Sequence, residues 1–317
     1  MLFDISVIIC AYSEARWQLL LAAVDSVRCQ TVQPREIILV IDHNPALVSR
    51  ARLTLPDVLV AENREGRGIS GARNTAIALA RGSVLVFLDD DACAEPDWLE
   101  HLLAGYADPR VIGVGGAIEP NWESPRPAWF PAEFGWVVGC SYIGMPQAAA
   151  AVRNLIGANL SVRRDVLEVL GGFRKGYGKV GAQSEPEDTD LCIRGLRQWQ
   201  YGIWLYEPRA VVHHFVPAVR TDWRYFIQRC YLEGRGKASL VRNVGVHDGL
   251  ETETAYVRQT LPAGFMRGLA DVWRGDLTGL ARSAVIVIGL GITMTGYAIG
   301  LVSRGVRPAR PSATVAL

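Results

Sequence analysis

Residues 83–91 read SVLVFLDDD, an apolar run that ends in three carboxylates, Asp89, Asp90 and Asp91. A short run of valine, leucine and phenylalanine is typical of a buried parallel strand, and open α/β sheets bind ligands at the carboxyl ends of such strands. Three adjacent carboxylates repel one another unless a cation lies among them, and oxygen ligands suit Mg²⁺ or Mn²⁺. The alternative is an acidic cap for a helix that begins near residues 96–99. The run alone leaves both interpretations open.

The segments around this run favour a ligand-binding sheet. Apolar runs and helical periodicities alternate along the first ninety residues, in the order of a doubly wound nucleotide-binding sheet. The expected strands cover residues 4–12, 36–41 and 58–61, and the expected helices cover residues 17–29 and 72–80. A glycine-rich loop at residues 64–71 precedes the second helix. Several strand ends would therefore offer polar groups to one crevice.

Five ordered motifs resemble the inverting, metal-dependent glycosyltransferases of family two, which have the GT-A fold. They are SVII at residues 6–9, Asp42 after a strand, GARN at residues 71–74, the acid triplet, and Glu187 with Asp188. The resemblance covers residues from about 4 to about 240. It implies an α/β, Rossmann-like, mostly parallel sheet flanked by helices. The catalytic domain would span residues 1–245, divided into a nucleotide-sugar half (1–118) and an acceptor half (119–245).

The resemblance also implies roles in binding a nucleoside-diphosphate sugar. Asp42 would accept a hydrogen bond from the base, which suits the imide N–H of uracil and a UDP-linked donor. Asp89 would bind ribose or sugar hydroxyls, and Asp91 would hold the Mg²⁺ or Mn²⁺ ion that bridges the diphosphate. Arg73 would add positive charge near the phosphates, or it is a surface arginine. The donor-contacting set is Ala11, Tyr12, Glu14, Asp42, Gly68, Arg73, Asp89 and Asp90.

The second half of the chain supplies an acid-rich loop, SEPEDTD at residues 184–190. Inversion at an anomeric carbon needs one base that takes the proton of the acceptor hydroxyl. By its match to the family motif that base is Asp188, with Glu187 and Glu185 as competitors. The alternative is an acid cluster that stabilises a helix dipole, a role also expected for Asp190.

Two histidines, His213 and His214, follow another apolar strand at residues 210–212. Neutral imidazole is a competent metal ligand, and the resemblance favours His214 as a ligand of the donor's metal. An aromatic and proline-rich stretch at residues 121–142 predicts an ordered loop. Its aromatic side chains would contact sugar rings or lipid chains, or would simply pack onto the sheet.

Composition excludes some classes of function. Lysine plus arginine total 33 against 32 for aspartate plus glutamate, so no strong positive field favours nucleic acid. No Gly-x-Gly-x-x-Gly follows the first strand, which argues against a dinucleotide-dependent oxidoreductase. A nucleotidyltransferase would carry a glycine-rich loop at the same place, and the absence of one argues against that class as well. Six scattered cysteines predict buried thiols in a reducing compartment, and the N-terminus shows no signal peptide. A non-catalytic nucleotide-sugar-binding or scaffold protein of a glycan assembly complex is the alternative to an enzyme.

The last part, residues 246–317, predicts a helical tail that associates with a membrane. An amphipathic pattern covers residues 265–280, and residues 284–302 carry no charge, just reaching the ~20 residues of a bilayer span. Gly296 and Gly300 form a Gly-x-x-x-Gly pair that could bring two helices together. Instead of spanning the membrane, the helix could lie on the membrane surface or pack within a homo-oligomer. The tail would hold the crevice at the cytoplasmic face.

Such a location favours a lipid-linked acceptor in envelope glycan, glycolipid or polysaccharide synthesis, with a soluble acceptor as the alternative. Processive members of the family carry Gln-x-x-Arg-Trp after the catalytic acid, and residues 197–200 read RQWQ. We therefore expect transfer of a single sugar.

Overall fold

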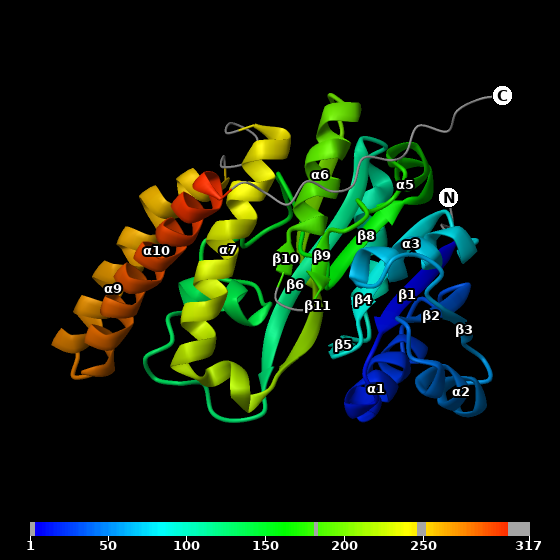
Figure 1. Cartoon of the computed structure of the whole chain (residues 1–317), viewed down its shortest axis with the longest axis horizontal. Helices are drawn as coiled ribbons and strands as arrows, with labels where there is room; N and C mark the ends of the chain where they lie inside the picture. The colour runs from blue at the N-terminus through cyan, green and yellow to red at the C-terminus, as the bar shows by residue number, and fades with distance from the viewer. Residues whose placement is uncertain (1–3, 181–182, 246–251, 304–317) are drawn as a thin grey trace.

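The structure is a computed structural model that describes residues 4–180, 183–245 and 252–303. Within these residues nine strands form one sheet in the order β3-β2-β1-β4-β8-β6-β11-β5, with β7 paired to β11 (Figure 1). The strands are β1 (Ile5–Ala11), β2 (Glu36–Ile41), β3 (Leu59–Glu62), β4 (Val84–Asp89), β5 (Ala92–Ala94), β6 (Val111–Trp122), β7 (Ala150–Val152), β8 (Asn159–Arg163) and β11 (Ile203–Val216). A separate hairpin consists of β9 (Gly178–Val180) and β10 (Gln183–Glu185).

The helices lie on both faces of this sheet, so the α/β fold expected from the sequence is confirmed. They are α1 (Trp17–Arg28), α2 (Pro45–Thr54), α3 (Ile69–Leu79), α4 (Trp98–Ala104), α5 (Arg164–Leu170), α6 (Glu187–Gln198), α7 (Trp223–Val244), α9 (Leu261–Trp273) and α10 (Thr278–Val302). Shorter helical turns are η1 (Glu14–Arg16), η2 (Gly105–Ala107), η3 (Ala132–Val138), η4 (Ala218–Thr221) and η5 (Tyr256–Thr260).

The first half is a parallel Rossmann-like unit. Strands β3, β2, β1 and β4 run parallel, and every residue of β1 except Cys10 is buried. Beyond β4 the sheet becomes mixed, because β8 runs antiparallel to both β4 and β6. Strands β6 and β11 are parallel to each other, and the short strands β5 and β7 pair antiparallel with β11.

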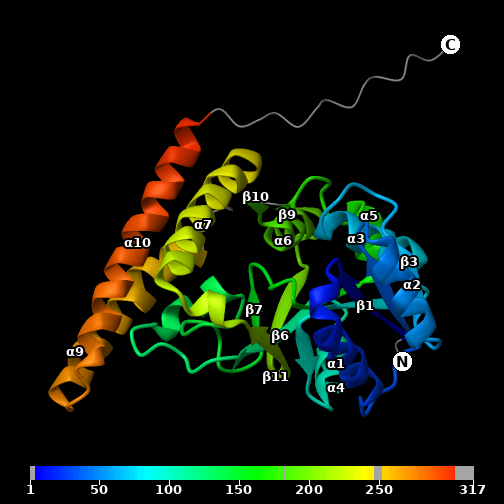
Figure 2. The same cartoon turned by 60° about the horizontal axis from the view of Figure 1, so that its bottom comes forward.

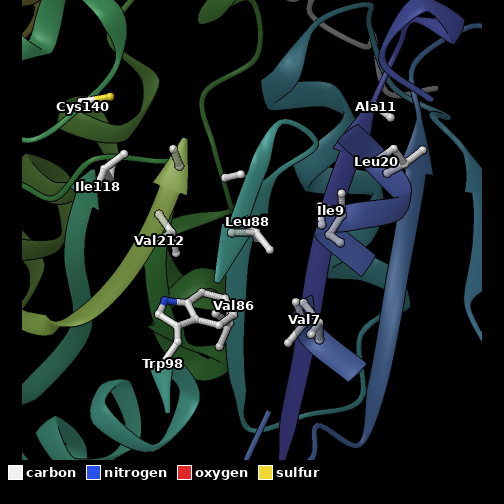
Figure 3. Packing of buried hydrophobic residues seen from close by; sticks show 14 of the residues in the cluster. Val7, Ile9, Ala11, Leu20, Val86, Leu88, Trp98, Ile118, Cys140 and Val212 are labelled. Carbon is white, nitrogen blue, oxygen red and sulfur yellow. The ribbon is translucent and has the colours of Figure 1, made fainter. Parts of the chain in front are cut away.

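Apolar side chains cover both faces of the sheet because strand residues alternate between them. Val7, Ile9 and Ala11 of β1 join a cluster that extends through Leu88 to Val212 of β11 (Figure 3). The residues between them, beginning with Ile8, belong to a second cluster on the opposite face. Strands β1, β2 and β4 are therefore buried on both faces, whereas β3 at the edge of the sheet is partly exposed.

The C-terminal helices pack beside α7, away from β1, β2 and β3 (Figures 1 and 2). Glycines form the contact: a Cβ at Gly296 would lie 2.2 Å from the backbone oxygen of Tyr231 on α7, and one at Gly300 would lie 2.6 Å from Ala238. The Gly-x-x-x-Gly pair thus brings α10 against α7 of the same chain. The division into residues 1–245 and 246–317 stays a prediction, and residues 246–251 and 304–317 lie outside the described part.

The surface of this helical tail is apolar. Met294 of α10 and Met266 of α9 are exposed, as are Leu277 between these helices and Trp273, whose exposed fraction is 92%. Glycines and Ser283 make up most of the buried residues of α10, with Val285 and Ile286, whereas many of its large apolar residues face outward, as in a helix that contacts lipid. Among the described residues, α10 is the one helix long and apolar enough to cross a membrane.

Candidate active site

The acid triplet lies at the carboxyl end of β4, in the middle of the sheet. Asp90 and Asp91 are buried, and Asp89 is partly buried. The chain continues into strand β5 and not into a helix, and the N-terminal cap of α4 is Asp97. The triplet therefore does not cap the following helix. Of the two interpretations, only the one in which the triplet binds a ligand remains.

Asp89, Asp91 and His214 form a cluster with the donor set of a cation site. One ligand atom from each lies within 4.8 Å of the others. The Nε2 atom of His214 lies 3.3 Å from Oδ1 of Asp91, and the backbone N–H of Phe215 donates to the Asp91 carbonyl at 2.8 Å. Carboxylate oxygens suit Mg²⁺ or Mn²⁺, and a neutral imidazole is a competent metal ligand beside them. The residues present therefore fit the predicted metal.

Electrostatics at the triplet disfavour the charged forms of Asp89 and Asp90, whereas for Asp91 the hydrogen bond and the charge of His214 outweigh burial and lower the pKa. Burial, with the nearby Asp91 and Asp89 charges, raises the pKa of Asp90 to about 7, although Arg16 opposes the rise. Burial also raises the pKa of Asp89. The Oδ2 atom of Asp90 is buried and has no hydrogen-bond partner. An additional positive charge would relieve this repulsion.

Arg16 is a site residue that the sequence analysis missed. Its Nη1 atom lies 2.8 Å from Oδ1 of Asp90 and 3.0 Å from Oδ2 of Asp91. It lies in η1, directly after the loop that follows β1. The one signal in the sequence was its place near the end of the first strand, beside the predicted crevice.

Arg73 is buried, with an exposed fraction of 3%, so the surface interpretation is wrong. Its Nη1 atom donates to Oε1 of Glu187 at 3.0 Å, and its Nη2 atom lies 3.5 Å from Oδ1 of Asp89. The same Nη2 atom donates to the carbonyl of Gly157 at 3.0 Å. Arg73 therefore connects Asp89 at the end of β4 to Glu187 in the acid-rich loop.

Glu187 and Asp188 begin helix α6 next to Arg73. Oδ2 of Asp188 accepts the backbone N–H of Gly157 at 2.9 Å, and Oδ1 accepts that of Thr189 at 2.6 Å. Burial, together with the Asp188 charge, raises the pKa of Glu187 to about 7, against the lowering effect of Arg73. Glu185 stays a competitor, because its Oε2 atom is buried without a partner.

Asp190 lies in the first turn of α6, the position expected for a residue that stabilises the helix dipole, and it also forms two ion pairs. It is completely buried and pairs with Arg174 at 2.9 Å and Arg194 at 2.8 Å. The pair with Arg174 attaches α6 to the loop after α5, and the pair with Arg194 lies within α6. Asp190 therefore helps to fix the first turn of α6.

Asp42 lies at the end of β2 with its carboxylate fixed by the protein. Oδ2 accepts the backbone N–H of Gly68 at 2.9 Å, and Oδ1 accepts Nδ2 of Asn63 at 2.6 Å. His43 lies 2.8 Å from the same Oδ1. A carboxylate offers about four acceptor sites, so one remains for a ligand.

The other expected donor residues surround the same strand ends. Ala11 closes β1 and is buried, Tyr12 has an exposed fraction of 57%, and Glu14 opens η1. Gly68 precedes α3 with a φ of 118°, a conformation that favours glycine. The structure therefore brings the ends of β1, β2 and β4 to one edge.

A cavity of about 680 Å³ opens beside the acid-rich loop. Its lining includes Glu185, Glu187 and Asp188, and also Leu290 and Met294 of α10. The aromatic stretch contributes Phe134, Trp136 and Tyr142 to the wall. Its other aromatic side chains pack internally, such as Phe130 against Phe226. The cavity thus connects the predicted base to the apolar tail.

All six cysteines are free thiols. Cys140, Cys192 and Cys230 are buried as expected, whereas Cys29 is exposed. Cys140 lies near the cation cluster, with Sγ 3.9 Å from Nδ1 of His214. The described thiols therefore form no disulfide framework.

The family pattern of glycosyl transferase family 2 matches residues 6–171, which include β1, the acid triplet and β8. The chain belongs to glycosyl transferase family 2. A glucosyl-dolichyl phosphate glucuronosyltransferase of Haloferax volcanii is 35% identical over 238 residues, covering 74% of this chain and 76% of the relative. The succinoglycan biosynthesis protein ExoM of Rhizobium meliloti is 27% identical, covering 62% of this chain and 60% of ExoM.

Solved structures confirm the GT-A type of fold for this family 2 glycosyltransferase. The mannosyltransferase PcManGT from Pyrobaculum calidifontis, in complex with GDP-Man and Mn²⁺, aligns with a TM-score of 0.57 at 20% identity. The alignment covers 92% of this chain and 87% of PcManGT. GalNAc-T7 with UDP, GalNAc and Mn²⁺ aligns with a TM-score of 0.53 at 18% identity, covering 81% of this chain and 56% of GalNAc-T7.

Proposed function

We propose that this glycosyltransferase moves one sugar from a nucleoside-diphosphate sugar, UDP-linked by the position of Asp42, to a hydroxyl group of a lipid-linked acceptor, with inversion. The product would enter envelope glycan, glycolipid or polysaccharide synthesis. The observation that carries this proposal is the cavity that runs from Glu187 and Asp188 to the apolar side chains of α10. The carboxylates in the lining can accept the proton of an acceptor hydroxyl, and the apolar side chains of α10 can pack against a hydrocarbon chain.

The donor would lie across the ends of β1, β2 and β4. Asp42 accepts a hydrogen bond from the base, and Asp89, with Asp90 beside it, faces the ribose and the sugar. Asp91 and His214 would hold Mg²⁺ or Mn²⁺. The ion, when bound, neutralises charge that develops on the departing nucleoside diphosphate.

The acceptor side would be organised by Asp188. Two backbone N–H groups fix its carboxylate, so it is oriented before the acceptor arrives. It takes the proton of the attacking hydroxyl as the new glycosidic bond forms and the bond to the diphosphate breaks. Arg73 pairs with both Asp89 and Glu187, and so fixes the position of the donor-binding carboxylate relative to the acid-rich loop that would bind the acceptor.

The lipid-linked acceptor is supported by the tail and by two relatives. Large apolar side chains face outward on α9 and α10, as expected for helices that contact lipid. One relative is named a glucosyl-dolichyl phosphate glucuronosyltransferase, and another a beta-monoglucosyldiacylglycerol synthase of Synechocystis. We place the protein at the cytoplasmic face of a membrane, spanning or lying on it through α10.

A donor panel tests this function. Full-length protein in mild detergent is incubated with Mn²⁺ or Mg²⁺, UDP- and GDP-linked sugars, and a lipid extract as acceptor source. Release of nucleoside diphosphate that depends on donor, ion and lipid supports the proposal. Donor binding with no release under any combination would instead favour a non-catalytic nucleotide-sugar-binding protein.

A further inference from the structure

Arg153, Lys237 and Glu253 form an ion cluster that the transfer chemistry above does not use. Oε2 of Glu253 lies 2.7 Å from Nη1 of Arg153, and Oε1 lies 3.0 Å from Nη2. Nζ of Lys237 lies 2.6 Å from the same Oε1. A guanidinium fork with an added ammonium is a geometry in which proteins bind carboxylates and phosphates.

The two cations are largely removed from water. The side chain of Arg153 is 6% exposed and that of Lys237 is 15% exposed. Burial raises the pKa of Glu253, but Lys237 and Arg153 outweigh this effect and lower the value to about 2. Glu253 is therefore a charged counter-ion, and Glu233 adds a second carboxylate 3.4 Å from Lys237. Among the residues that the structure describes, these two cations thus face two anions.

The cluster lies on the wall of the 680 Å³ cavity, because Arg153, Lys237 and Glu253 all line it. Asp188 and Met294 line the same cavity. The cluster therefore borders open space that a ligand can enter. It combines an anion-binding geometry with the two other features of the acceptor cavity, an acid and an apolar wall.

We propose that Arg153 and Lys237 bind the phosphate that joins the lipid chain of the acceptor to its head group, and that Glu253 occupies this site until the acceptor displaces it. The inference rests on the proposed function, since it supplies the charge recognition for a lipid-linked acceptor. An incoming phosphate replaces the carboxylate of Glu253 with another anion, so the buried cations are never left unpaired.

Calorimetric titration of the full-length protein in mild detergent, without donor, tests the site. The probes are hexyl phosphate, hexyl β-glucoside as a neutral ligand of equal chain length, and inorganic phosphate. Wild type is expected to bind hexyl phosphate more tightly than either of the other two. Arg153→Gln and Lys237→Gln should each weaken hexyl phosphate binding about tenfold or more, because a charge-assisted hydrogen bond is lost.

Glu253→Gln gives the decisive result. Removal of the competing carboxylate frees the site, so hexyl phosphate should bind at least about threefold more tightly than to wild type. Arg110→Gln is the matched control: it breaks an exposed pair with Asp108, 2.7 Å long and outside the cavity, and should change nothing. If Arg153→Gln fails to fold, Arg153→Lys replaces it in the test. Lysine keeps the positive charge but lacks the two parallel N–H donors of the guanidinium, so its affinity for hexyl phosphate should be lower than that of wild type.

Three results would overturn the proposal. Weaker binding in Glu253→Gln would show that the cluster only fixes the tail. Equal affinity for inorganic and hexyl phosphate would show a site for free phosphate, and equal affinity for hexyl β-glucoside would show apolar binding alone. Because the titration contains no donor, its outcome does not test sugar transfer. A failure of the donor panel likewise would not change the result of the titration, so the two proposals can fail separately.

Discussion

Replacing Asp188 with asparagine separates the proposed base from the fold around it. The structure fixes both carboxylate oxygens with backbone N–H groups, from Gly157 and from Thr189. Asparagine offers one acceptor oxygen, so one N–H group loses its partner. We expect the free energy of unfolding to fall by about 1–3 kcal/mol. A domain stabilised by about 5–15 kcal/mol keeps its fold after such a change.

The catalytic effect of Asp188→Asn should be much larger than the structural one. Loss of a general base lowers turnover by a factor of about 10²–10⁴, which corresponds to about 3–5 kcal/mol of barrier. Donor affinity should stay near that of wild type, because the proton transfer occurs only in the transition state. The measurements are nucleotide release at saturating donor and acceptor, and calorimetric titration with the donor.

Asp165→Asn is the matched control for this variant. Asp165 also lies in the first turn of a helix, and its Oδ1 accepts a backbone N–H at 2.9 Å, but it is exposed on α5. It should keep wild-type turnover. If Asp188→Asn also keeps more than about half of the activity while Glu187→Gln loses a hundredfold or more, the base is Glu187 and our assignment is wrong.

Three further outcomes are expected. Because the pKa of Glu187 is raised to about 7, its ion pair with Arg73 beside the predicted base Asp188 forms fully only as the pH rises; kcat/KM should therefore increase by less than about tenfold through pH 7 in wild type and lack this limb in Glu187→Gln, and an unchanged limb in that variant would contradict this positioning role. Gly296→Leu should destabilise the protein by about 1–3 kcal/mol in thermal unfolding, whereas Gly291→Leu, with open space around it, should not. Full-length protein should sediment with liposomes and Trp273→Asp/Leu277→Asp should do so less; equal sedimentation would refute a role for these exposed side chains.

The parallel half of the fold was predictable because its signals are local. The strand expected over residues 36–41 is β2, and the helix expected over residues 17–29 is α1. Helix α2 was not predicted, although Asn44 accepts the backbone N–H of Leu47 at 3.1 Å and Pro45 follows it, a recognisable helix start. Short, weakly amphipathic helices show little hydrophobic periodicity in the sequence. Such helices are predicted better from capping residues at their N-terminus, such as Asn44 followed by Pro45 here.

The residues of the site were predictable where a motif names them, and their partners were not. Asp89, Asp91 and His214 are distant in sequence, yet β4 and β11 bring them within reach of one cation. The buried position of Arg73 and the contact between Arg16 and Asp90 depend on how the loops fold back over the sheet. No spacing along the chain encodes such contacts, because they arise only when the tertiary structure forms.

The most direct test of the account is Mn²⁺ binding followed by electron paramagnetic resonance, with and without UDP. Wild type should bind Mn²⁺ together with UDP, and Asp91→Asn and His214→Ala should each weaken Mn²⁺ binding at least about tenfold, since each removes a proposed ligand. His213→Ala is the matched control, because His213 is adjacent on β11 but pairs with Glu95 at 2.5 Å. Wild-type Mn²⁺ affinity in both Asp91→Asn and His214→Ala would contradict the proposed metal-dependent donor site.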